Sequence, residues 1–222
     1  MTQPVTERPA GAPAGYKLRF PGTWWHLDLD PNTRDASIRR KIESQVKSAP
    51  QLSREQVDDL IRSTRRTARD AHAQGALQAS GMLRILSAGN GPLVLSATAL
   101  VLRVSVPEEQ SEDLADLVVA AGLQVGADSE GSGLPPGEVE LVDLPLVGSV
   151  GRITRIEEVE LKGQRTPTAM RHTLIPVPNS RDYLVLACST PNVHLAEQFY
   201  EVFDAIAASF HFDGVDDEEN GK

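Results

Sequence analysis

The sequence has little cysteine and no long apolar run. The one cysteine among 222 residues, Cys188, cannot form an internal disulfide, and it lies in an apolar segment where a thiol acts as a small hydrophobic group. No run approaches the ~20 apolar residues that a membrane-spanning helix needs, and residues 1–13 lack the basic and apolar regions of a secretory signal. We therefore expect a cytoplasmic protein with no membrane insertion.

Positive charge is also scarce, with 22 Lys and Arg against 31 Asp and Glu and a net charge of -9 at pH 7. Nucleic acids and anionic membranes both attract clustered Lys and Arg, so the composition argues against both as general partners. The exception is local, because residues 34–84 are basic whereas residues 108–160 and 213–219 are acidic. This asymmetry favours another protein, of acidic character, as the partner.

The motifs of common enzymes are absent as well. No serine occupies a Gly-x-Ser-x-Gly setting, and the histidines are scattered without an assigned acid or nucleophile partner. The glycine-containing turns at residues 89–91 and 131–133 lack the lysine and the strand-to-helix context of a phosphate loop. We therefore predict no catalytic residue and no cofactor, and we expect a binding role.

The C-terminal part has the clearest pattern of secondary structure. Residues 183–189 are apolar or small at both alternating sets of positions, which predicts a central strand covered on both faces. Residues 189–191 offer a hydroxyl cap and a proline for the start of a helix. The apolar stripe of that helix is Ala196, Phe199, Phe203, Ile206 and Phe210, and we expect it to pack on the sheet.

The N-terminal part predicts a hairpin followed by two helices. Residues 16–20 and 23–30 alternate like two strands around a Pro-Gly turn. A helix should follow from residue 34 to 48, and the capping box at residues 53–56 should start a second helix that runs to about residue 79. Small residues in its second half bury little area each, so this half should be less firmly held.

Alternation of period two predicts the remaining strands, which are residues 82–86, 92–106, 138–144, 151–161 and 167–177. A short helix should begin near residue 114, and the stretch 127–137 should be an exposed loop. The chain therefore reads as α+β, with a mainly antiparallel sheet sandwiched by helices. We expect a disordered segment at 1–15, one domain at 16–212 with a helical insertion at 34–79, and an acidic disordered tail at 213–222.

The segments TLIPVP at 173–178, YLVLACSTP at 183–191 and FYEVFDAIAASF at 199–210 resemble the PsbP/Mog-type family, and FPGTWW at 20–25 is similar to its opening strand. The arginine-rich composition favours a bacterial source. The chain resembles a bacterial cytosolic member, related to Lpq-type lipoproteins but without a lipoprotein signal. This resemblance implies an antiparallel sheet between helical layers. Because members mostly bind partners, it also implies a non-catalytic adaptor or accessory subunit of a larger bacterial assembly.

His26, Asp28 and Asp30 alternate on one face of the second predicted strand. An imidazole and two carboxylates are suitable first ligands for a divalent metal. The competing interpretation is a solvent-facing side of a hairpin whose turn begins at Asp30. A metal-dependent protein or enzyme is therefore the alternative function, and no second cluster completes the site.

Two features are candidate contacts for a protein partner. The first is a positive stripe on the second helix, made of Arg62, Arg65, Arg66 and Arg69. Its competing interpretation is a solvated face that nearby aspartates neutralise. The second is Trp24, because adjacent Trp24 and Trp25 must point to opposite sides of a strand and an exposed tryptophan is a common interface anchor. Core packing of both tryptophans remains the alternative, and we expect a partner to dock on residues 24–79.

Overall fold

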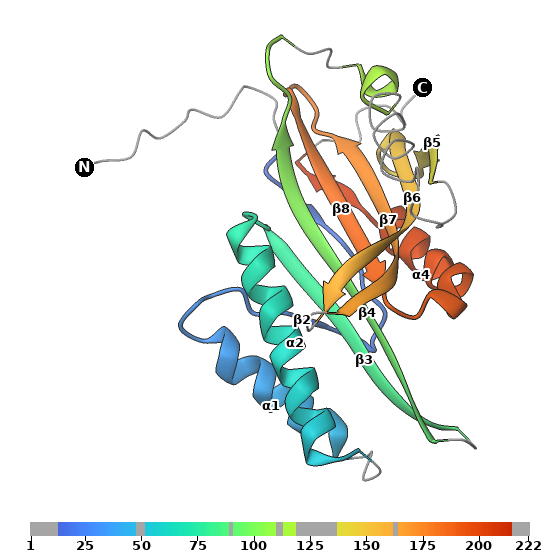
Figure 1. The fold of residues 1–222 in the computed structure, drawn as a ribbon. Coiled ribbons are helices and arrows are strands. Elements are labelled where there is room, and N and C mark those ends of the chain that lie inside the picture. The colour runs from blue at the N-terminus through green and yellow to red at the C-terminus, as the bar shows by residue number, and fades with distance from the viewer. Residues whose placement is uncertain are drawn as a thin grey trace.

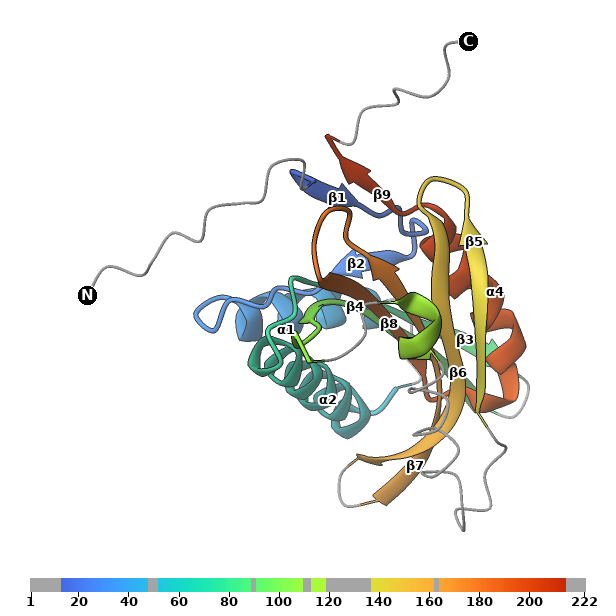
Figure 2. The same ribbon diagram turned by 90° about the horizontal axis from the view of Figure 1, so that it is seen from above.

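A seven-stranded antiparallel sheet forms the centre of the molecule, with the strand order β2-β3-β4-β8-β7-β6-β5. The computed structural model describes residues 13–47, 52–88, 91–109, 113–118, 137–161 and 164–214. Helices α1 and α2 cover one face of the sheet, and α4 covers the other (Figures 1 and 2). The predicted α+β class, with a mainly antiparallel sheet between helices, is confirmed. Predictions for residues 1–12, 119–136 and 215–222 fall outside the described residues.

The strands and helices have the following bounds along the chain. The strands are β1 (Gly15–Lys17), β2 (Trp24–His26), β3 (Gln78–Ala88), β4 (Gly91–Ser105), β5 (Glu138–Leu144), β6 (Gly148–Leu161), β7 (Gln164–Pro176), β8 (Asp182–Thr190) and β9 (His211–Asp213). The helices are α1 (Arg34–Val46), α2 (Arg54–Ala73), the 3-10 turn η1 (Val193–Leu195) and α4 (Ala196–Ala208), and residues 114–118 add a short helical segment.

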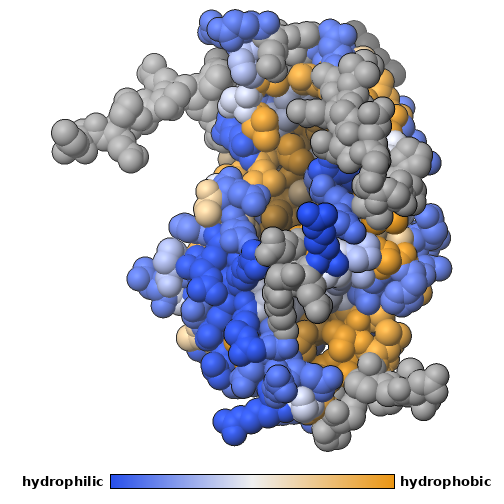
Figure 3. All heavy atoms as spheres, in the orientation of Figure 1, coloured by the Kyte–Doolittle hydropathy of each residue, from blue (hydrophilic) through white to orange (hydrophobic). Residues whose placement is uncertain are grey.

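The helical pair lies where the sequence predicts an insertion, between β2 and β3. The capping box at the start of α2 is present, because Ser53 Oγ accepts from the Gln56 amide at 3.2 Å and the Ser53 amide donates to Gln56 Oε1 at 2.8 Å. The outward surface of the two helices is hydrophilic (Figure 3). The predicted end near residue 79 is wrong, since α2 stops at Ala73 and Gly75 reverses the chain at a φ of 74°.

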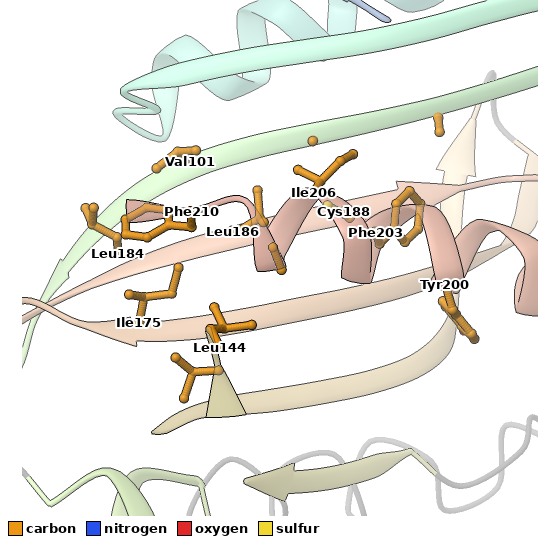
Figure 4. Packing of buried hydrophobic residues seen from close by; sticks show 14 of the residues in the cluster. Val101, Leu144, Ile175, Leu184, Leu186, Cys188, Tyr200, Phe203, Ile206 and Phe210 are labelled. Carbon is orange, nitrogen blue, oxygen red and sulfur yellow. The ribbon is translucent and has the colours of Figure 1, made fainter. Parts of the chain in front are cut away.

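The face of the sheet covered by α4 holds the larger core. Even-numbered residues of β8 and odd-numbered residues of β4 point to this side, as strand alternation requires (Figure 4). The predicted apolar stripe of α4 is confirmed. Phe203 is 1% exposed and contacts the rings of Trp24 and Tyr200. The predicted central strand is also confirmed, because β8 lies between β4 and β7.

The predicted hairpin of residues 16–30 is wrong. Strand β1 pairs with β9 in a separate two-stranded sheet, whereas β2 pairs with β3 at the edge of the large sheet (Figure 2). Aromatic packing accounts for the difference, since Tyr16 stacks on Phe210 at 5.6 Å between ring centroids and Lys17 pairs with Asp213 at 2.7 Å. The N-terminal strand is therefore held by the last strand of the domain.

The start of α4 also differs from its prediction. Strand β8 continues through Thr190, and the α-helix begins only at Ala196. Instead of capping a helix, Thr190 Oγ1 donates to the carbonyl of Ser96 at 2.8 Å, and Asn192 Oδ1 accepts from the amide of Ser96 at 2.9 Å. These bonds stabilise the junction between β8 and β4. The hydroxyl of Thr190 is buried, so it needs a hydrogen-bond partner inside the protein, and the carbonyl of Ser96 supplies one.

Candidate functional site

The carboxylates of Asp28 and Asp30 are used by the turn that leads into α1. Asp28 Oδ2 accepts from the Thr33 hydroxyl at 2.6 Å, and this hydrogen bond holds the pKa of Asp28 below its usual value. Asp30 Oδ1 accepts from the amide of Asn32 at 2.8 Å. Across the described ranges, no group of three His, Cys, Asp or Glu side chains is arranged to hold a metal ion. The geometry therefore favours the turn interpretation of His26, Asp28 and Asp30.

Both tryptophans of β2 pack inside the molecule, on opposite faces of the sheet. Trp24 is 9% exposed and packs between Phe20 and Phe203, so the expected role of Trp24 as an exposed partner anchor is wrong. Trp25 is partly exposed on the side of α1 and α2, where the Nζ atom of Lys41 lies 5.9 Å from its ring centroid. Adjacent residues of a strand point to opposite faces of the sheet, as Trp24 and Trp25 do. Helices cover both faces, so neither tryptophan is fully exposed.

Arg65 differs from the other arginines of the predicted stripe. Its Nε and Nη2 atoms donate to the backbone carbonyl of Asp35 at 3.1 and 2.6 Å. These two bonds connect the middle of α2 to the first turn of α1. Arg65 therefore stabilises the helical pair, and its side chain is only 21% exposed.

The other three arginines lie on the outer side of α2. Arg62 pairs with Asp59, and Arg66 Nε lies 3.7 Å from Asp70 Oδ2. Arg69 Nε donates to the carbonyl of Arg65, and no carboxylate among the described residues forms an ion pair with it. We call the exposed cations on this side the helical-pair surface, which consists of Arg39, Arg40, Arg62, Arg66 and Arg69. It forms part of the hydrophilic region of Figure 3.

A cavity of about 350 Å³ lies between α2 and the sheet, and we call it the α2 cavity. One wall is the side of α2 that carries Ser63, Thr67 and Asp70, and the floor crosses β3, β4, β8, β7 and β6. The amino-acid sequence alone does not predict this site. Ser63 and Thr67 look like part of a polar helix face, and only the folded chain places them opposite Thr98 and Ser189.

The lining of the α2 cavity combines apolar side chains with hydroxyl groups. The apolar part includes Trp25, Leu60, Leu100, Val159 and Met170. The hydroxyl groups are those of Ser63, Thr64 and Thr67 on α2 and of Ser96, Thr98, Thr168 and Ser189 on the sheet. Asp70 is the one charged side chain among the described residues that line the cavity. Such a lining suits a ligand that is mostly apolar and uncharged.

Two buried groups on the sheet have strongly shifted pKa values. Burial, with a smaller contribution from Arg155, lowers the pKa of His172 to about 4. His172 lies two residues beyond Met170 on the same face of β7 as the α2 cavity. On the opposite face, burial raises the pKa of the Cys188 thiol well above its ordinary range. Neither group is arranged with a partner for nucleophilic catalysis.

The solved structures to which this chain is similar include LpqN and a cyanobacterial PsbP. LpqN of Mycobacterium tuberculosis, described as involved in cell envelope biogenesis, has a TM-score of 0.41 and 12% identity over 90% of this chain and 86% of its own. PsbP (CyanoP) of Synechocystis sp. PCC 6803 has a TM-score of 0.36 and 12% identity over 94% of this chain and 98% of its own. At such low similarity neither one transfers an activity, ligand or partner, and membership of the PsbP/Mog-type family stays a prediction.

No protein-family model matches the chain, and no curated protein matches its sequence. Among the described residues, no helix has both the length and the hydropathy that a membrane span requires. The cytoplasmic location remains a prediction from the sequence.

Proposed function

We propose that this chain is a non-catalytic adaptor or accessory subunit that binds an acidic protein through the helical-pair surface. One observation carries the proposal, which is the local reversal of charge. Helices α1 and α2 contain nine Lys and Arg against six Asp and Glu, in a chain whose net charge is -9. A local positive field on an acidic molecule attracts an acidic partner to one side and repels it elsewhere.

The internal ion pairs of α2 reduce this field without removing it. Arg62 and Arg66 each have a carboxylate on the same helix, and exposed pairs of this kind contribute little to stability. Arg40 and Arg69 have no ion-pair partner among the described residues. The helical pair is also the insertion relative to the fold that the sequence resembles, and binding functions are commonly placed on such additions to a scaffold.

The test is a triple charge reversal on the outer side of α2. Arg62→Glu, Arg66→Glu and Arg69→Glu are combined, and the matched control combines Lys17→Glu, Arg84→Glu and Arg165→Glu, which changes the net charge equally at exposed sites elsewhere. Circular dichroism and thermal melting check that both variants fold. Proteins captured from source cells by the wild-type chain are identified, and each is purified for binding measurements.

The association rate with the purified partner is then measured at about 50 and 200 mM salt, which shortens the range of exposed charges. We expect the α2 reversal to lower the rate on the order of tenfold at low salt and to remove most of its salt dependence. The control should behave like the wild type. Equal rates for both variants, or no protein that depends on the three arginines, would contradict docking at the helical-pair surface.

A further inference from the structure

The shape of the α2 cavity limits the ligand that it can hold. Its floor crosses five neighbouring strands, from β3 to β6, which at ~4.8 Å per strand spacing is a span of roughly 19 Å. A volume of about 350 Å³ over that length leaves a cross-section of roughly 18 Å². Carbon atoms pack about 4 Å apart, so one extended alkyl chain needs roughly 16 Å². Averaged over this span, the cavity therefore has room for one alkyl chain and not for two side by side.

The charges of the lining select the head group. No Lys, Arg or His occurs among the described residues that line the cavity, and the carboxylate of Asp70 lies at its edge with a 60% exposed side chain. A carboxylate or phosphate on the ligand would lose water without gaining a cation, which is costly in a confined site. The hydroxyl groups on both walls instead match an uncharged head that donates and accepts hydrogen bonds.

The hydroxyl groups of α2 are oriented by their own helix. Ser63 Oγ and Thr64 Oγ1 donate to the carbonyl of Leu60 at 3.0 and 2.8 Å, and Thr67 Oγ1 donates to the carbonyl of Ser63 at 3.2 Å. Each hydroxyl oxygen keeps lone pairs for a further hydrogen bond. On the floor, Thr98 Oγ1 and Ser189 Oγ are joined at 2.8 Å. The walls therefore offer mainly acceptors to a ligand hydroxyl.

Trp25 contributes its ring to the cavity and not its donor. Its indole lines the cavity, but its Nε1–H has almost no accessible surface, so a ligand atom of the size of a water molecule does not reach it. Gln74 at the end of α2 lines the cavity as well, and its side-chain amide can donate a hydrogen bond to an ester or alcohol oxygen.

We propose that the α2 cavity binds an uncharged single-chain amphiphile, with an alkyl chain along the sheet and an ester or alcohol head among the hydroxyl groups. This site lies on the inner side of α2, whereas the helical-pair surface lies on its outer side. The inference therefore goes beyond the proposed docking function and does not depend on it.

The binding test compares two probes with the same chain. Monodecanoylglycerol has an uncharged ester head and decanoate has a carboxylate, and both are titrated below their micelle-forming concentrations by calorimetry and by tryptophan fluorescence. We expect monodecanoylglycerol to bind one to one and to change the fluorescence of Trp25. Decanoate should bind at least about tenfold more weakly, because its charge has no cation in the cavity.

Two substitutions place the probe in the cavity. Thr67→Phe fills it from the α2 wall and should abolish binding, while the control Ala73→Phe adds the same ring at an exposed position of α2 and should leave binding unchanged. If Thr67→Phe does not fold by circular dichroism, Ser63→Leu takes its place.

Several results would overturn the proposal. The first is that monodecanoylglycerol does not bind to the folded wild-type chain. The second is that decanoate binds with equal affinity, and the third is that Thr67→Phe or Ser63→Leu binds monodecanoylglycerol as tightly as the wild type. The triple reversal of Arg62, Arg66 and Arg69 should leave the affinity for monodecanoylglycerol unchanged. A failure of the cavity and a failure of protein docking can thus be told apart.

Discussion

The two faces of the sheet are built from different side chains. The core under α4 contains the rings of Trp24, Phe199, Tyr200, Phe203 and Phe210, which contact one another in several directions. The core under α1 and α2 consists of buried aliphatic residues, Leu27, Ile38, Ile42, Ile61, Ala68, Ala79 and Leu83. Aromatic rings bury far more area than alanine, so α4 is held more firmly than α2. The α2 cavity lies on the aliphatic side.

The arginines on the two faces of the sheet also differ in what they contact. On the α4 side, Arg171 lies over the ring of Tyr200 at 4.2 Å and its Nη1 donates to Asp204 at 2.6 Å, while Arg152 also pairs with Asp204 at 3.3 Å. These cations hold α4 on the sheet. On the other side most arginines of α2 point to water. The arginines on the α4 side therefore hold a helix on the sheet, whereas most arginines of α2 are exposed to solvent.

The largest expected effect tests the aromatic face. Phe203→Ala should lower the free energy of unfolding by about 3–5 kcal/mol, because the 1% exposed ring leaves a cavity among Trp24, Phe199 and Tyr200. Urea denaturation followed by circular dichroism measures the change. A variant that unfolds at the wild-type urea concentration would mean that α4 does not anchor the core.

The second prediction concerns His172, on the face that carries the α2 cavity. Its folded-state pKa of about 4 lies below the unfolded value near 6.5. Above pH 6.5 the His172 side chain is neutral in both the folded and the unfolded chain. Between pH 6.5 and 4 only the unfolded chain takes up the proton, so stability falls by about 3 kcal/mol across this range.

His172→Gln removes this titration. The stability of the wild type should therefore fall more steeply than that of the variant between pH 6.5 and 4, and the two curves should run parallel below pH 4. The lowered pKa values of Asp28 and Asp182 change stability mainly at the acidic end of this range and below it, and they do so equally in both proteins, so they do not affect the difference between the curves. Parallel curves over the whole range, from denaturation at each pH, would show that His172 is not buried in solution.

The third prediction addresses the aliphatic face directly. Ile61 is 2% exposed in the core under α2, and Ile61→Ala should cost about 2–3 kcal/mol. This is the lower end for such a substitution because α2 borders the α2 cavity and has room to shift toward the sheet. The comparison with Phe203→Ala, in the same urea titration, is decisive. A cost equal to that of Phe203→Ala would mean that both faces are packed alike.

Local periodicity explains which parts of this fold the sequence predicts. The apolar stripe of α4 and the two-sided apolar pattern of β8 repeat with a fixed period, so both elements are visible in short windows. The capping box of Ser53 and Gln56 is likewise a signal within four residues. Each depends on neighbours along the chain and not on distant partners.

Pairing between distant segments explains what the sequence does not predict. Alternation predicts a strand at residues 16–20, but nothing local states that the observed β1 pairs with residues 211–213. In the same way, Thr67 on α2 and Thr98 on β4 meet only because the two layers pack. Arg65 belongs to the predicted stripe by spacing, yet its partner is a carbonyl on α1. A site formed between layers has no signature in either segment.

The smallest expected effect separates Arg65, which connects the two helices, from the arginines of the helical-pair surface. Arg65→Ala should lower the free energy of unfolding by about 1–2 kcal/mol, because it removes two charged hydrogen bonds to the carbonyl of Asp35 in a partly shielded site. Arg62→Ala should cost at most about 0.5 kcal/mol, since its pair with Asp59 is exposed. Denaturation of both variants in parallel measures the difference. Equal costs would place Arg65 with the docking residues, and the charge reversal on α2 would then have to include it.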